Sequence, residues 1–174
     1  ELETHGGSLR VYFRRQDGPG PAPSERVAEI RARELALGYA DLGVYQAFGE
    51  RVALTKRRLL RFLIEAKEAG KRVAGYGAPG KGNTLLNYCG IRTDFLDFLV
   101  DRNPYKHGRF TPGTHIPIHP VERIDEARPD YLLIMPWNLT REITRQMRHV
   151  GGWGCRFVVA VPEVTIIDPA EVPA

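Results

Sequence analysis

Cysteine is scarce in this chain, and long hydrophobic runs are missing. Two cysteines, Cys89 and Cys155, among 174 residues are too few for a disulfide scaffold, and no C-x-x-C pair indicates zinc. The longest apolar runs, residues 131–137 and 157–162, have only the length of strands. They predict neither a membrane span nor a signal peptide. These absences favour a protein of the reducing cytoplasm with no membrane partner.

The chain also has only a small excess of positive charge. The chain has 25 Lys and Arg against 21 Asp and Glu, a net charge of +4 that suits a small anionic ligand but not a nucleic-acid partner. Hydrophobic residues make up 43% of the chain, enough for one domain with appendages. The sequence begins without a methionine, which we interpret as a sign of a fragment. Catalytic groups preceding Glu1 would then be absent from it.

Glycine is concentrated where an apolar strand runs into a helix. Four glycines, Gly75, Gly77, Gly80 and Gly82, let the backbone approach a ligand, and the free N–H groups of the following helix favour an anion. Lys81 adds a mobile positive charge at the same place. This pattern predicts a phosphate-binding turn. The alternative is that the glycines only allow the strand and helix to pack tightly.

The same segment fits two nucleotide-binding motifs. Gly75, Gly77 and Gly80 fit G-x-G-x-x-G, and Asp101 ends the next strand, where a ribose-binding acid lies in dinucleotide folds. Residues 75–81 also fit G-x-x-x-x-G-K, but Gly82 stands where a P-loop needs the Ser or Thr hydroxyl that holds Mg²⁺. A nucleoside triphosphatase is therefore not expected.

The rest of the chain predicts an α/β domain preceded by smaller elements. Alternating apolar side chains over residues 8–15 predict a half-exposed strand. Residues 16–24 have the composition of a linker. Two helices are expected to follow, over residues 25–37 and 42–69. Strands and helices then alternate, which indicates a Rossmann-like, three-layer domain with a parallel sheet. The expected strands are 72–76, 97–100, 116–118, 131–135 and 156–161, and the expected helices are 81–88, 121–127 and 139–149.

Three loops should meet at one crevice, because ligands of parallel sheets bind beyond the carboxyl ends of the strands. These loops are residues 77–84, 101–106 and 136–138. Trp137 is expected either to stack on a base or to join the core. Asn138 is expected to cap the following helix, although a residue in that position can also face a ligand.

The histidines raise the question of a metal. His115 and His119 are four residues apart, but the intervening prolines exclude the helix that would place them on one face. We therefore expect these two residues and His107 to be metal-free. His107 and His119 could act as general acids or bases, although no pattern assigns them that role.

Five segments in this order resemble the C-terminal domain of bacterial S-adenosylmethionine-dependent nucleotide-sugar C-methyltransferases. The segments are His-Gly-Gly-Ser-Leu-Arg (5–10), Gly-Tyr-Gly-Ala-Pro-Gly-Lys-Gly-Asn-Thr-Leu-Leu (75–86), Asp-Arg-Asn-Pro-Tyr-Lys-His-Gly (101–108), Pro-Gly-Thr-His-Ile-Pro-Ile (112–118) and Met-Pro-Trp-Asn (135–138). The resemblance implies that residues 1–15 close an upstream methyltransferase domain, 16–24 form a linker, and 25–174 form a Rossmann-like domain that binds a nucleotide-linked sugar.

The resemblance also implies that different domains of the protein have different functions. S-adenosylmethionine would bind to the upstream domain, zinc would occur only in a missing N-terminal module, and no catalytic residue would lie in this chain. The partners would be the nucleotide-linked keto-sugar and the upstream domains of the same chain. Together with the crevice geometry, the resemblance predicts these substrate-binding residues: Gly77, Ala78, Lys81, Gly82, Asn83, Thr84, Asp101, Asn103, Lys106, Trp137 and Asn138.

Two other functions fit the same motifs. G-x-G-x-x-G with Asp101 is also compatible with an NAD(P)-dependent oxidoreductase, although Lys81 directly after the third glycine is unusual there. The other is a non-catalytic module that binds a nucleotide.

Overall fold

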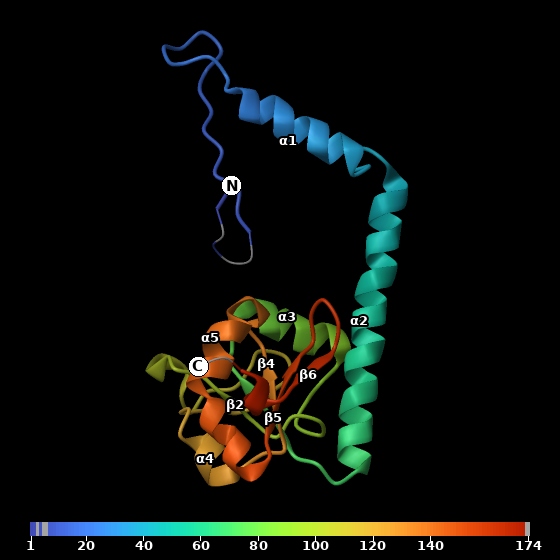
Figure 1. Ribbon diagram of the computed structural model, residues 1–174, viewed down its shortest axis with the longest axis vertical. Helices are drawn as coiled ribbons and strands as arrows, with labels where there is room; N and C mark the ends of the chain where they lie inside the picture. The colour runs from blue at the N-terminus through green and yellow to red at the C-terminus, as the bar shows by residue number, and fades with distance from the viewer. Residues whose placement is uncertain (3, 5–6, 173–174) are drawn as a thin grey trace. The chain divides into compact units, whose positions relative to one another are not determined.

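The computed structural model describes residues 1–2, 4 and 7–172, which form two compact units, Glu1–Val52 and Ala53–Ala174 (Figure 1). The two units divide within a long helix, α2 (Leu42–Glu68). The three segments predicted from the sequence, with boundaries at residues 15 and 24, remain a prediction.

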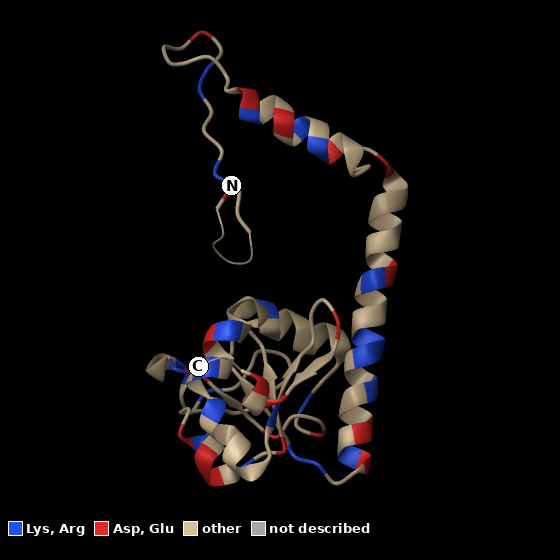
Figure 2. Cartoon of the chain, in the orientation of Figure 1, with Lys and Arg blue, Asp and Glu red and all other residues tan. Residues whose placement is uncertain are grey.

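The first unit contains helix α1 (Glu25–Ala36) and the start of α2. α1 buries none of its residues, and the first eight residues of α2 carry no charge (Figure 2). The strand predicted over residues 8–15 does not form: Ser8 makes only an isolated antiparallel bridge with Leu2. A strand needs a neighbour to satisfy its backbone groups, and within this unit Val11 and Phe13 remain exposed.

The second unit is built on a six-stranded sheet in the order β3-β2-β1-β4-β5-β6. β1 to β5 are parallel and β6 is antiparallel to β5, which confirms the predicted α/β fold class. β6 was not predicted, although the β-branched run Val-Thr-Ile-Ile (164–167) is typical of a strand. The strands are β1 (Val73–Tyr76), β2 (Leu99–Val100), β3 (Ile118–His119), β4 (Tyr131–Ile134), β5 (Arg156–Val159) and β6 (Thr165–Ile167).

Short helices connect these strands. The helix predicted over residues 139–149 is divided into three pieces, because the chain takes the tighter 3₁₀ conformation at both ends of α5. None of the described helices combines the length and apolar character needed to cross a membrane. The α-helices are α3 (Gly80–Cys89), α4 (Arg123–Ala127) and α5 (Thr140–Gln146), and the 3₁₀ helices are η2 (Pro104–Lys106), η3 (Trp137–Leu139), η4 (Arg148–Trp153) and η5 (Pro169–Glu171).

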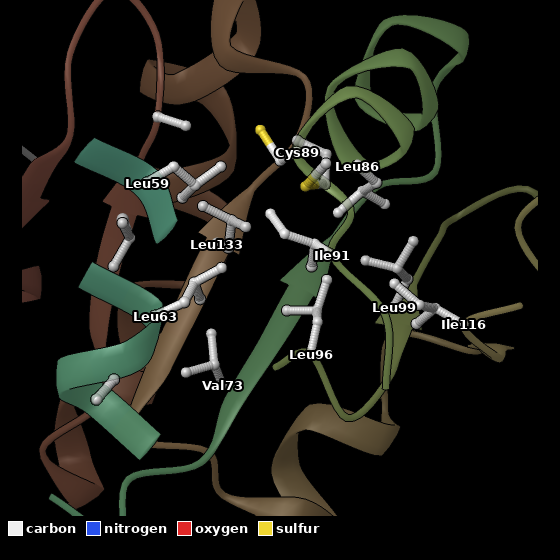
Figure 3. Close-up of a cluster of buried hydrophobic side chains, with 14 of the residues drawn as sticks. Leu59, Leu63, Val73, Leu86, Cys89, Ile91, Leu96, Leu99, Ile116 and Leu133 are labelled. Atoms are coloured by element: carbon white, nitrogen blue, oxygen red, sulfur yellow. The ribbon is translucent and has the colours of Figure 1, made fainter. Parts of the chain in front are cut away.

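The two faces of the sheet bury separate hydrophobic clusters. On one face, Leu59 and Leu63 of α2 and Leu86 of α3 pack over Leu133 of β4 (Figure 3). On the other face, α4, α5 and η4 contribute the second cluster, which contains Ile143. Burying each such leucine or isoleucine stabilises the fold by about 1.5–3 kcal/mol. The unit is therefore a three-layer domain with α2 and α3 on one side and α4 and α5 on the other.

The topology predicts a crevice beyond the carboxyl ends of the central strands of this sheet. β1 is bonded to β2 on one side and to β4 on the other. The chain runs from β1 to β2 and β3 and then returns through α4 to β4. The strand order thus reverses between β1 and β4, where ligands of such sheets bind.

Candidate functional site

Three of the four motif glycines lie where a side chain would crowd neighbouring atoms. A Cβ atom at Gly75 would lie 2.2 Å from Leu99 Cδ2. One at Gly77, whose φ is +85°, would lie 2.8 Å from Pro136 Cδ. Gly82 is buried, and a Cβ there would lie 3.0 Å from Met135 Cβ. The packing interpretation of the motif therefore holds at these three positions.

Gly80 differs from the other three glycines. It is the exposed first residue of α3, its φ is not in the left-handed region, and a Cβ built there would meet no atom within 4 Å. Pro79 occupies the N-cap position and makes no side-chain cap hydrogen bond. The start of α3 is therefore open to the crevice, and its first N–H groups have no side-chain acceptor from the cap residue.

The ammonium of Lys81 has only neutral partners. Lys81 Nζ donates a hydrogen bond to Asn138 Oδ1 and lies 4.9 Å from the ring centroid of Trp137. Among the described residues, no carboxylate forms an ion pair with it. A cation at the beginning of a helix opposes the helix dipole, so Lys81 contributes little to the stability of α3.

Asn138 does not cap the next helix, so this expectation was wrong. α5 begins after Leu139 and has no side-chain cap, and the side chain of Asn138 accepts from Lys81 instead. Trp137 is half-buried and packs in part against the second hydrophobic cluster, which fits the core expectation, but the ring also faces the Lys81 ammonium.

Asp101 fastens the loop after β2 to the turn after β1. Its Oδ2 accepts hydrogen bonds from Ala78 N at 2.7 Å and from Lys106 Nζ at 2.8 Å, and its Oδ1 accepts from Asn103 N at 2.8 Å. Lys106 Nζ also donates to the carbonyl oxygen of Ala78 at 3.1 Å. His107 Nε2 donates to the carbonyl oxygen of Asp101 at 2.7 Å.

The protonation of Asp101 reflects these contacts. Burial alone would raise the pKa of this carboxyl, since only 12% of its side chain is exposed. The hydrogen bonds from Lys106, Ala78 and Asn103 and the charge of Lys106 outweigh burial and bring the pKa below its usual value. Asp101 is therefore a carboxylate at neutral pH, with both of its oxygens engaged by the protein.

The remaining predicted side chains differ in their surroundings. Asn83 Oδ1 is buried and has no hydrogen-bond partner within the described part of the chain. Thr84 is exposed, and its hydroxyl donates back to the carbonyl oxygen of Gly80 at 3.2 Å. Asn103 Oδ1 accepts from Tyr105 N at 3.0 Å and caps η2.

The three predicted loops do meet. The Ala78–Asp101 and Lys81–Asn138 hydrogen bonds connect the loop after β1 to the loops after β2 and β4. The convergence expected from the topology is confirmed, whereas the binding roles of the residues stay predictions. The hydroxyl of Thr84 forms its hydrogen bond within α3.

Sequence reasoning missed a cavity beside this crevice. Its volume is about 370 Å³, and Asp101 forms part of its wall. Tyr76, at the end of β1, also lines it, with residues just before the start of α4 and at the end of α5. In the sequence, only the large aromatic residue between two motif glycines, Tyr76, indicated this cavity. The residues near α4 and α5 approach Tyr76 only in the folded chain.

The described residues form no arrangement suited to metal binding or to thiol chemistry. Within residues 1–2, 4 and 7–172, no group of three or more His, Cys, Asp or Glu is arranged to hold a metal. Both cysteines are buried, and burial, with a smaller effect of the Asp130 charge, raises the pKa of Cys155 to about 12, so its reactive thiolate is not formed at neutral pH. That the histidines are metal-free remains a prediction.

Comparison with known proteins identifies the family of this chain. A family model described as the C-methyltransferase C-terminal domain matches residues 3–162. The chain belongs to this C-methyltransferase family. It is 37% identical over 172 residues to the C-methyltransferase NovU of Streptomyces niveus, a match that covers 95% of this chain and 39% of that protein. The C-methyltransferase domain thus spans about two fifths of the length of its relative.

The C-methyltransferase domain was also compared with solved structures. The crystal structure of UDP-D-quinovosamine 4-dehydrogenase from Vibrio fischeri superposes with a TM-score of 0.43 and 15% identity, over 56% of this chain and 93% of the other.

Proposed function

We propose that this C-methyltransferase domain binds a nucleotide-linked keto-sugar for methyl transfer from S-adenosylmethionine, which is held by another domain of the same protein. The observation that carries the proposal is Lys81: its ammonium lies at the uncapped start of α3 and has no carboxylate partner among the described residues. A positive charge in this position is best explained by an anion supplied from outside the chain.

A diphosphate has the chemistry that this position requires. The first N–H groups of α3 point at the crevice, and the helix dipole favours negative charge there. Lys81 adds a charge-assisted hydrogen bond, and the absence of a side chain at Gly80 leaves room for a phosphate oxygen to approach the backbone. The diphosphate linking a sugar to its nucleoside would fit between α3 and the Trp137–Asn138 segment.

The remaining residues would hold this site in place. Asp101 and Lys106 fix the Ala78 backbone, so they set the position of the turn that leads into α3. In the proposed reaction, the upstream domain would supply the base that removes a proton alpha to the sugar ketone. S-adenosylmethionine would supply the methyl group to the enolate carbon, with its methyl–sulfur bond breaking to release S-adenosylhomocysteine. This chain would present the substrate and contribute no catalytic group. A cytoplasmic location would suit such an enzyme.

The alternative of an NAD(P)-binding domain is weakened by Asp101. In a dinucleotide site, the acid at the end of the second strand accepts hydrogen bonds from ribose hydroxyls. Here both carboxylate oxygens already accept bonds from Ala78, Asn103 and Lys106, and the side chain is 12% exposed. A ribose would have to compete with these donors.

Calorimetric titration of the chain with dTDP-glucose, UDP-glucose and NADH tests the proposal. We expect a nucleotide sugar to bind more tightly than NADH, and more weakly at higher ionic strength. Lys81→Met should weaken binding roughly tenfold to a hundredfold, the range for hydrogen bonds to charged groups.

Lys71→Met is the matched control, because Lys71 pairs with Asp130 at the opposite end of β1 and its loss changes the net charge equally. It should leave binding unchanged. Tighter binding of NADH than of either sugar nucleotide, or equal loss in both lysine variants, would overturn the proposal.

A further inference from the structure

The cavity beside the crevice is lined by both apolar and polar side chains. The apolar part of its wall includes the buried side chains of Tyr76 and Met147 and the half-buried Val121. The other lining residues are Asp101, Arg102, His107, Glu122 and Gln146. A volume of about 370 Å³ lies within the range of small-molecule sites.

Tyr76 carries a hydroxyl that the protein does not use. The residue is 5% exposed and lines the cavity, yet its hydroxyl forms no hydrogen bond with any described residue. It retains access to solvent, since Asn83 Oδ1 is the one unpartnered side-chain polar atom found fully buried in the described part of the chain. Burial raises the pKa of Tyr76, so the hydroxyl stays protonated and able to donate. Buried tyrosines ordinarily find a partner for this group.

We infer that the cavity binds the nucleoside, base and ribose, of the nucleotide-linked sugar, with the Tyr76 hydroxyl donating to it. The inference rests on the proposed function and assigns a separate part of the ligand to a separate part of the chain. The diphosphate lies at α3, on one side of β1, and the nucleoside lies on the side of α4 and α5. Gly77 directly follows Tyr76 and places no side chain between the two.

The chemistry of the cavity suits a heterocycle. Bases combine an apolar ring with donors and acceptors at the edge, and the cavity wall combines a thioether and an aromatic ring with polar side chains. Gln146 Nε2 donates to Glu142 at 2.8 Å, which leaves its amide oxygen available to a base. The guanidinium of Arg102 lies 3.8 Å from the same glutamate and offers further donors.

The sugar is the less suitable occupant. Its reacting carbon must remain open to a methyl donor held outside this chain, whereas a group that contacts the buried side chains of Tyr76 and Met147 would lie below the surface of this chain. The nucleoside takes no part in the reaction, so it can be enclosed and supply binding energy.

Titration of the chain with nucleoside 5′-diphosphates (ADP, CDP, GDP, UDP and dTDP) and with inorganic pyrophosphate tests the assignment. We expect at least one nucleoside diphosphate to bind at least tenfold more tightly than pyrophosphate. Tyr76→Phe should weaken that binding by about fivefold to tenfold, as for one lost hydrogen bond, and leave pyrophosphate binding unchanged. Gln146→Trp, which places a bulky ring at the cavity mouth, should abolish the preference for the nucleoside.

Tyr88→Phe is the matched control, because it removes a phenol hydroxyl from α3 while keeping the ring that faces Lys56. Equal binding of pyrophosphate and every nucleoside diphosphate would overturn the nucleoside pocket while leaving the diphosphate site intact. Nucleoside preference unaffected by Tyr76→Phe and Gln146→Trp would also overturn it. Failure of both pyrophosphate and the diphosphates to bind would overturn this assignment together with the proposed function.

Discussion

Two lysines at the same edge of the sheet differ in what surrounds them. Lys106, in the loop after β2, pairs with Asp101 at 2.8 Å and donates to the Ala78 carbonyl at 3.1 Å. Lys81, at the start of α3, meets an amide oxygen and an aromatic ring and no described carboxylate. The charge of Lys106 is balanced by Asp101, whereas no carboxylate in the described part of the chain balances the charge of Lys81.

This difference distinguishes a lysine that supports the fold from a lysine that is available to a ligand in the same crevice. A charge that the fold itself neutralises contributes to stability, and its loss exposes the partner to an unfavourable environment. A charge placed against a helix dipole with neutral partners contributes little to stability, and its value must come from a ligand. We therefore expect the loop after β2 to act as a support and the loop after β1 to form the proposed binding surface.

Loss of the Asp101 carboxylate should have the largest effect on stability. Asp101→Ala leaves two backbone N–H groups and the Lys106 ammonium without their acceptor, so we expect the free energy of unfolding to fall by about 3 kcal/mol. Asp97→Ala is the control, because Asp97 pairs with the partly exposed Lys67 and should cost less than about 1 kcal/mol. Urea denaturation of both variants measures the difference. Equal losses would show that Asp101 does not support the crevice.

The two lysines should respond differently to the same substitution. Lys106→Met leaves the buried Asp101 carboxylate short of a partner, and since Lys106 is 34% exposed, solvent moderates the loss to about 1–2 kcal/mol of unfolding free energy. Lys81→Met should change that free energy by no more than about 0.5 kcal/mol. Thermal and urea unfolding of the two variants, compared with their affinity for dTDP-glucose, provides the test. A larger loss of stability from Lys81→Met would reverse the interpretation.

Acid should weaken the support loop selectively. The folded state depresses the pKa of Asp101, so its contribution to stability is complete above the unfolded-state pKa of about 4 and is lost as the pH falls through the folded-state value. Asp101→Asn removes this titration. Urea unfolding at neutral pH and at successive steps below pH 4 should therefore show a smaller acid-induced loss in the variant than in the parent. Identical pH profiles would contradict the role assigned to the carboxylate.

The sequence was sufficient to predict the sheet and the convergence of its loops. Alternation of apolar runs with glycine turns predicted five of the six strands, and the rule for parallel sheets then brought Ala78, Asp101 and Asn138 to one edge. The strand predicted over residues 8–15 does not form within the described chain, because alternation records only which faces of a strand are apolar. It does not say whether a neighbouring strand is present to bond to it.

The division of roles within the crevice could not be predicted in the same way. Lys81 and Lys106 were both predicted to bind the substrate, and only the folded structure shows that Lys106 is paired with Asp101. The cavity was missed for a similar reason, because Tyr76, Glu122 and Gln146 are far apart in the chain. Asn138 was misassigned because a cap depends on where the helix begins, and α5 begins two residues later.

The smallest expected change concerns Gly80 and distinguishes a ligand-facing glycine from a packing glycine. An alanine there meets no atom and has an ordinary backbone conformation, so Gly80→Ala should leave the free energy of unfolding unchanged or raise it by about 0.5 kcal/mol. Gly82→Ala brings a methyl group to 3.0 Å from Met135 Cβ, and this crowding should cancel or reverse the gain expected at Gly80. If a diphosphate approaches the start of α3, Gly80→Ala should nevertheless weaken dTDP-glucose binding several-fold. A Gly80→Ala protein that is stable and binds normally would show that the ligand does not reach this backbone.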